Sequence, residues 1–123
     1  MPKVVAVIGA SRDRKKFGNR AVRAYQAQGH TVVPINPNET EIEGLKAYKS
    51  VLDVPGPIDM ATVYVQPDVA IRVMDEIARK GIGELWLNPG ADDSAVIDRA
   101  RALQLQPIVA CSIVGIGKNP YDF

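Results

Sequence analysis

The sequence predicts a three-layer α/β domain, with a parallel sheet between two layers of helices. Short apolar, β-branched segments alternate along the chain with segments of helical periodicity. The first apolar segment, residues 3–8, lacks polar alternation, which is typical of a strand covered on both faces. Together these two observations favour repeated strand-helix-strand units over an all-helical or all-strand fold.

The first two strands are predicted at residues 3–8 and 31–35, with a helix at about 18–28 between them. Gly29 follows the helical pattern and is expected to end that helix. Pro34 lies inside the second strand and provides no backbone N–H group. It therefore favours an edge position or a bulge.

The middle of the chain, residues 36–59, is the least regular part, and it offers only a short helical possibility around 49–54. A third strand is predicted at 60–65. In the stretch after Pro67, apolar residues recur at the i, i+3 and i+4 positions of a helix, which Gly81 is expected to end.

The last elements are a strand at 84–87, a helix at 93–103 and a strand at 107–110. Strands joined through helices imply right-handed crossovers and a parallel sheet. We therefore expect residues 1–123 to form a single Rossmann-like domain with a five-stranded, mostly parallel sheet.

Composition limits the partners of the chain. A chain of 123 residues that is 46% hydrophobic suits one globular domain. Lysine and arginine total 15 against 14 acidic residues, so the overall charge gives no reason to expect a nucleic-acid partner. The single cysteine cannot form an internal disulfide, and no apolar run approaches the roughly 20 residues that span a bilayer. We expect a cytoplasmic protein without membrane contact.

Ligands of parallel α/β sheets bind at the carboxyl ends of the strands. Glycine, proline and amide residues dominate the segments that follow the predicted strands, and acids and bases are rare among them. These segments are Gly9-Ala10-Ser11, Asn36-Pro37-Asn38, Gln66-Pro67, Asn88-Pro89-Gly90 and Cys111-Ser112. Such a rim is better suited to holding a ligand than to reacting with it.

A basic loop follows Gly9, with Arg12, Arg14, Lys15 and Lys16 just ahead of the first helix. Positive charge beside a helix N-terminus attracts phosphate groups. The alternative interpretation is an ordinary solvated basic loop.

The usual dinucleotide fingerprint is absent. After Gly9 the next glycine is Gly18, and Asn36 stands where an acid would bind the ribose of NAD. The glycine-lysine motif of ATP-hydrolysing proteins is also missing. A ligand with several phosphates remains compatible with the basic loop.

Five motifs in order resemble the small stand-alone CoA-binding proteins, which are similar in turn to the N-terminal CoA-binding domain of the succinyl-CoA synthetase α subunit. The motifs are Gly9-Ala10-Ser11, Lys16-Phe17-Gly18, Asn36-Pro37, Val65-Gln66-Pro67 and Trp86-Leu87-Asn88-Pro89-Gly90-Ala91. The resemblance implies that CoA lies across the strand ends. Its pyrophosphate would lie at the first loop, its adenosine between the loops after the second and third strands, and its pantetheine arm toward the later loops. This chain has Asn38 where relatives often carry a basic residue, and Asn88 where they often carry glutamine.

The candidate site combines these motifs with the cysteine that follows the fifth strand. The predicted ligand-binding residues are Gly9, Ala10, Ser11, Arg12, Lys16, Phe17, Gly18, Asn36, Pro37, Val65, Gln66, Pro67, Asn88, Pro89, Gly90 and Cys111. Lys16 and Arg12 are expected to contact phosphate. Cys111 is either a small buried side chain or a neighbour of the CoA thiol that forms a mixed disulfide under oxidation.

No catalytic or metal-binding arrangement is predicted. The only histidine, His30, lies between the first helix and the second strand, away from the rim, and one cysteine with one histidine cannot build a Cys/His metal site. Asp92 and Asp93 are expected to cap the following helix. We therefore expect non-catalytic binding of coenzyme A or an acyl-CoA. A small NAD(P)- or nucleotide-dependent enzyme, or an interaction subunit without ligand, are the alternatives. A protein partner or a second copy of the chain is compatible with each.

Overall fold

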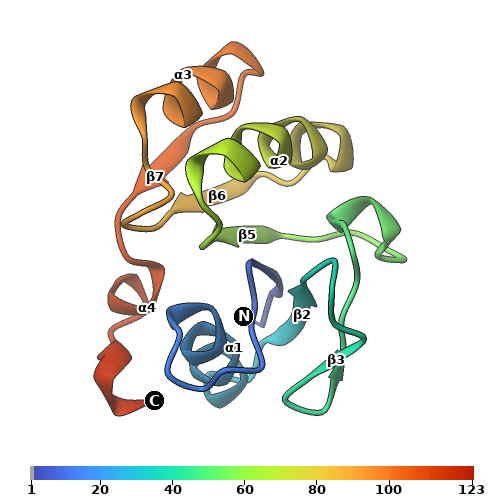
Figure 1. The fold of residues 1–123 in the computed structure, drawn as a ribbon, viewed down its shortest axis with the longest axis vertical. Helices are drawn as coiled ribbons and strands as arrows, with labels where there is room; N and C mark the ends of the chain where they lie inside the picture. The colour runs from blue at the N-terminus through green and yellow to red at the C-terminus, as the bar shows by residue number, and fades with distance from the viewer. Residues whose placement is uncertain (1) are drawn as a thin grey trace.

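The computed structural model describes residues 2–123 and contains the predicted five-stranded sheet (Figure 1). Its strands are β1 (Val4–Ile8), β2 (Thr31–Ile35), β5 (Met60–Val63), β6 (Glu84–Leu87) and β7 (Pro107–Val109). They pair in parallel in the order β2-β1-β5-β6-β7. The predicted Rossmann-like α/β class is therefore confirmed.

Helices cover both faces of this sheet (Figure 1). One layer contains α1 (Phe17–Ala27), α4 (Ser112–Gly115) and the 3-10 turn η2 (Pro120–Asp122). The other contains α2 (Pro67–Lys80), α3 (Ser94–Ala102) and the 3-10 turn η1 (Val51–Asp53). Among residues 2–123, no helix is long and apolar enough to cross a bilayer.

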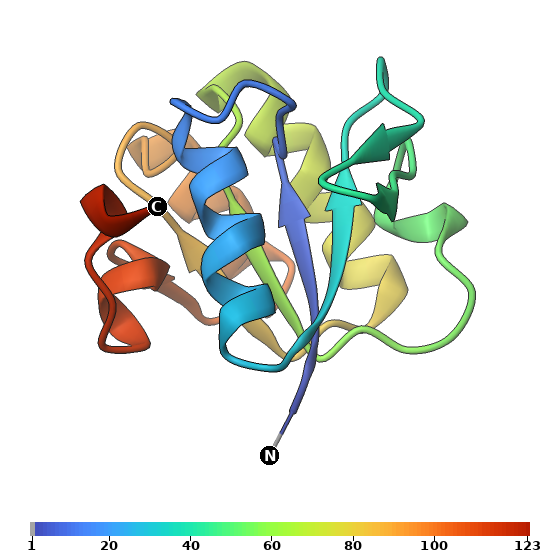
Figure 2. The same cartoon turned by 90° about the horizontal axis from the view of Figure 1, so that it is seen from below.

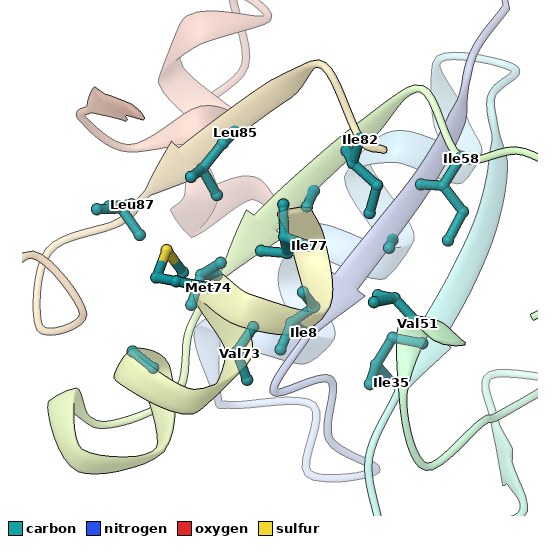
Figure 3. Close-up of a cluster of buried hydrophobic side chains, with 14 of the residues drawn as sticks. Ile8, Ile35, Val51, Ile58, Val73, Met74, Ile77, Ile82, Leu85 and Leu87 are labelled. Carbon is teal, nitrogen blue, oxygen red and sulfur yellow. The ribbon is translucent and has the colours of Figure 1, made fainter. Parts of the chain in front are cut away.

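The interior strand β1, which lies between β2 and β5, shows why the first apolar segment lacks polar alternation. Val5 and Val7 pack with the α1 layer, whereas Ala6 and Ile8 pack with the α2 layer, and all four are buried. Successive side chains of a strand point to opposite faces, so both faces of β1 must be apolar. Figure 3 shows Ile8 in the cluster of buried side chains around α2.

The order of the strands determines where a ligand can bind. From β1 the chain crosses through α1 to β2 on one side, and it later returns to β5 on the other side of β1. The loops after β1 and β5 therefore diverge at the carboxyl end of the sheet, which is the switch point where ligands of such folds bind. Figure 2 shows the strands pointing toward the edge that carries the loop after β1, drawn in dark blue.

The irregular middle of the chain is an antiparallel hairpin of β3 (Glu41–Ile42) and β4 (Leu45–Lys46). Glu43 and Gly44 turn this hairpin with positive φ angles of 51° and 77°. Two-residue strands are too short for a periodic pattern, so the sequence did not predict them. The helical possibility around 49–54 is only the short turn η1.

The other predicted boundaries differ by at most a few residues. β2 is an edge strand, as Pro34 predicted. Gly81 ends α2 in the left-handed conformation, and the Asp93 carboxylate accepts the N–H of Ala95 at the start of α3. β5 ends at Val63 instead of residue 65, which leaves the next two residues free to turn toward the candidate site.

Candidate ligand-binding groove

Three adjoining cavities follow the carboxyl ends of the strands. The α2 cavity, of about 450 Å³, lies between the loop after β2 and helix α2. The loop cavity, of about 580 Å³, lies over the loop after β1 and the first turn of α1. The Cys111 pouch, of about 90 Å³, is lined by Phe17, Tyr64, Asn88, Pro89 and Cys111.

Shared lining residues join the cavities into one groove. The α2 cavity and the loop cavity share Gly9, Asn36, Val65 and Val69. The loop cavity and the Cys111 pouch share Phe17, Tyr64 and Pro89. The groove therefore runs from α2, across the switch point, to the residue that precedes α4.

Two glycines bring the backbone of α1 against the end of β1. Gly9 has a φ of +90°, and a Cβ atom there would lie 3.0 Å from the Val65 side chain. A Cβ atom on Gly18 would lie 2.2 Å from the carbonyl oxygen of Gly9. Only glycine at both positions permits this close approach. The wide spacing from Gly9 to Gly18 thus produces a close backbone contact without the dinucleotide fingerprint.

The loop cavity has features of an anion site. In the described part of the chain, no protein acceptor binds the backbone N–H groups of Ala10, Ser11, Phe17 or Gly18, all of which line this cavity. The first turn of α1 contains no acidic residue, and Lys16 lines the same cavity. Free N–H groups at a helix start, together with a cation, favour a phosphate group.

The other cations of the basic loop face away from the groove. A guanidinium nitrogen of Arg12 lies 3.6 Å from a carboxylate oxygen of Glu39, and one of Arg14 lies 3.6 Å from a carboxylate oxygen of Glu43. Neither arginine lines any of the three cavities. The loop therefore offers Lys16 to the groove and uses its arginines to contact the segment around the β3-β4 hairpin.

Asn36 holds the loops after β1 and β2 together. Its Nδ2 donates to the carbonyl oxygen of Ala10 at 2.8 Å, and its Oδ1 accepts the N–H of Asn38 at 2.8 Å. Its own N–H donates to the carbonyl oxygen of Tyr48. The asparagine at the usual position of the ribose-binding acid therefore fixes the width of the groove.

The α2 cavity has an apolar wall and a charged rim. Four core side chains that Figure 3 labels form part of the wall: Ile8, Ile35, Val51 and Val73. Lys49, Arg72 and Glu76 also line it, and the sequence analysis did not single them out. Arg72 lies three residues after Val69 and four before Glu76 on α2, so the three side chains share one face of the helix. This spacing is the sequence signal that could have indicated these lining residues.

A buried polar network supports the Cys111 pouch. The Asn88 amide donates to the hydroxyl of Thr62 at 2.7 Å and accepts the N–H of Ser112 at 2.8 Å. The hydroxyls of Thr62 and Ser112 lie 2.7 Å apart, and the Tyr64 hydroxyl lies 3.3 Å from that of Ser112. Burial raises the pKa of Tyr64 to about 12, so its phenol is neutral at pH 7. These groups bond to one another and provide no charged base.

The structure brings most of the predicted site residues into one groove. Those that line it are Gly9, Ala10, Ser11, Lys16, Phe17, Gly18, Asn36, Pro37, Val65, Gln66, Asn88, Pro89 and Cys111. Arg12, Pro67 and Gly90 lie outside its lining. Pro67 is the first residue of α2, and Gly90 donates its N–H to the Asp92 carboxylate in an exposed turn. Away from the rim, the Nδ1 of His30 accepts the N–H of Lys3, the residue before β1.

The fold defines a Rossmann-like domain with a groove at its switch point. The sequence model described as "CoA binding domain" matches residues 3–116, and the chain belongs to this family.

The relatives of this chain include ADP-forming CoA ligases that are much longer than it. The alpha subunit of acetate-CoA ligase (ADP-forming) I from Pyrococcus furiosus is 38% identical over an alignment of 135 positions, which covers 97% of this chain and 29% of that protein. The 4-hydroxybutyrate-CoA ligase (ADP-forming) of Nitrosopumilus maritimus is 38% identical over an alignment of 129 positions, which covers 94% of this chain and 18% of the ligase. The chain spans only 12% to 29% of the length of the ADP-forming ligases that it matches.

Solved structures show the same fold in a small chain and in a large one. A conserved hypothetical protein from Pyrococcus furiosus superimposes with a TM-score of 0.83 at 31% identity, covering 94% of this chain and 99% of that chain. The apo dinucleotide-forming acetyl-coenzyme A synthetase 1 of Ca. Korarchaeum cryptofilum superimposes with a TM-score of 0.77 at 29% identity. That match covers 89% of this chain and 26% of the synthetase.

Proposed function

We propose that this chain binds coenzyme A or an acyl-CoA across the carboxyl ends of its strands and performs no reaction of its own. The observation that carries this proposal is the order of features along the groove. An apolar cavity, a phosphate-type site and a narrow pouch follow one another. Coenzyme A presents its adenine, its pyrophosphate and its pantetheine arm in the same order.

Each part of the ligand then meets a suitable surface. The pyrophosphate lies in the loop cavity against Lys16 and the free N–H groups of the first turn of α1. The adenine packs against the apolar wall that includes Ile35 and Val51. The pantetheine arm passes Phe17 and ends near Cys111, in a pouch whose volume equals that of about three water molecules. Such a pouch suits a thiol or a short acyl group.

The side chains at the strand ends support a binding role without catalysis. Asn36 and Asn88 use their amides in hydrogen bonds within the protein, and Tyr64 is a neutral phenol. A general base must reach its substrate and accept a proton near neutral pH.

Thermal unfolding with a panel of ligands tests this proposal. The purified chain is melted with CoA, acetyl-CoA, NAD, NADP or ATP. A ligand at 100 times its Kd stabilises the folded state by about 2.7 kcal/mol, so CoA and acetyl-CoA are expected to raise the Tm with increasing concentration. An absent shift with both CoA ligands, together with a clear shift with NADP, would overturn the proposal in favour of an NAD(P)-linked function. No shift with any of the five would favour an interaction subunit without ligand.

A further inference from the structure

Two cations from separate parts of the chain line the same α2 cavity. Lys49 lies in the segment between β4 and η1, and Arg72 lies in the second turn of α2. Both side chains line the cavity and both residues are exposed to solvent. The cavity also includes Gly9 and Asn36, which it shares with the loop cavity. A charged group bound near the two cations can therefore belong to the same ligand as a phosphate bound at α1.

The positive charge of this pair is not neutralised within the described residues. Between residues 2 and 123, neither Lys49 nor Arg72 has an ion-pair partner or a side-chain hydrogen bond. The only acid that lines the cavity is Glu76, whose Oε1 accepts a hydrogen bond from the Ser50 hydroxyl at 2.5 Å. Two cations and one carboxylate leave this lining with a net positive charge, so the rim of the cavity favours an anion.

Coenzyme A carries an anion that matches this position. Besides the pyrophosphate on the 5′ side of its ribose, it carries a phosphate on the 3′ oxygen. If the adenine packs against the apolar wall of the α2 cavity, the ribose lies between this wall and the loop cavity. The pyrophosphate and the 3′-phosphate then lie in different parts of the groove. Asn38 lines the α2 cavity with a neutral side chain, whereas Lys49 and Arg72 line it with positive charges.

We propose that Lys49 and Arg72 bind the 3′-phosphate of the ligand and make the groove select 3′-phosphorylated adenosine ligands. This inference rests on the proposed function, since it assumes that CoA occupies the groove. Arg72 can donate two parallel hydrogen bonds to phosphate, and Lys49 adds a second point charge. Dephospho-CoA, which has a free 3′-hydroxyl, lacks this contact and retains every other part of the ligand.

Calorimetric titration with CoA and with dephospho-CoA tests the inference. The unmodified chain is expected to bind CoA at least tenfold more tightly than dephospho-CoA, a difference of about 1.4 kcal/mol. Arg72→Ala and Lys49→Ala should each reduce this preference several-fold, and the double variant should bind both ligands about equally. The affinity for dephospho-CoA should change by less than about twofold. The preference should also fall as salt is added, because the contact is exposed and ionic.

Arg79→Ala is the matched control, because it removes an exposed arginine from the same helix outside the cavity. It should retain the full preference for CoA. Equal binding of both ligands by the unmodified chain would overturn the inference and leave the proposed function intact, and this comparison needs no variant. Loss of affinity for both ligands by the same factor in Arg72→Ala would also overturn it. Failure of the unmodified chain to bind either ligand would refute the proposed function itself.

Discussion

Two groups of basic side chains lie near the groove, and they differ in what neutralises them. In the loop after β1, Arg12 and Arg14 pair with Glu39 and Glu43 and lie outside the groove lining. At the α2 cavity, Lys49 and Arg72 line the groove, and neither has an ion-pair partner among residues 2–123. Density of charge along a sequence therefore does not locate an anion site. We expect an anion site where charge remains unneutralised and a ligand can reach it.

The β3-β4 hairpin explains this difference. It supplies Glu43 from its turn, and the segment just before it supplies Glu39. Exposed ion pairs of this kind contribute about 0–1 kcal/mol, so the arginines tether the loop only weakly. What fixes the loop is the backbone contact between Gly9 and Gly18 and the hydrogen bond from Asn36 to Ala10.

The largest expected effect comes from moving the loop without changing its charge. In Gly18→Ala the new methyl group would lie 2.2 Å from the Gly9 carbonyl oxygen, so the start of α1 must shift away from β1. Overpacking of this kind costs about 1–3 kcal/mol of unfolding free energy. We expect that loss in urea denaturation, together with loss of CoA binding in calorimetry.

Gly83→Ala is the control, since a Cβ atom there meets nothing within 4 Å and its φ is not positive. It should change the unfolding free energy and CoA affinity little. A Gly18→Ala variant as stable as this control, with undiminished CoA binding, would show that the backbone contact does not determine the groove.

The sequence predicted the regular elements well because their periodicity extends over several residues. β2 and β6 begin and end at the predicted residues, and α2 stops before Gly81 as predicted. The hairpin, α4 and η2 were not predicted, since two to four residues are too few for a periodic signal. These short elements adopt their conformations through local turns and tertiary packing instead.

The site was predictable where it follows directly from strand ends. Gly9, Asn36 and Pro89 line the groove because parallel strands end at one edge of the sheet. Lys49 and Arg72 were not predicted, because they line one cavity only through the way the middle segment packs beside α2. The ion pair of Arg12 with Glu39 was not predicted either, because it also depends on how the middle segment packs.

A smaller effect, on ligand binding alone, is expected from Lys16→Ala. Charge-assisted hydrogen bonds contribute about 1.5–3 kcal/mol, so the affinity for CoA should fall roughly tenfold or more. Dephospho-CoA should lose the same factor, because both ligands carry the pyrophosphate. The preference between them should therefore persist, which separates the role of Lys16 from that of the pair at the α2 cavity. The lysine is exposed and its side chain does not cap α1, so the Tm of the free protein should not change. Unchanged affinity in calorimetry would mean that Lys16 is only a solvated surface residue.

The smallest effect is expected from Arg12→Ala, although Arg12 belongs to the most conspicuous basic segment of the sequence. Its side chain is 73% exposed and its guanidinium lies beside Glu39, outside the groove lining. Removing it should therefore change CoA affinity by less than about threefold and the unfolding free energy by less than about 1 kcal/mol.

Glu39→Gln is the companion variant, because it frees Arg12 without removing it. If Arg12 contributes only to its surface pair, both variants should bind CoA as the unmodified chain does in calorimetry. A tenfold loss in Arg12→Ala, with tighter binding in Glu39→Gln, would show that Arg12 leaves its carboxylate for the ligand phosphate. The ion pair seen in the free protein would then compete with ligand binding, and both groups of cations would serve the groove.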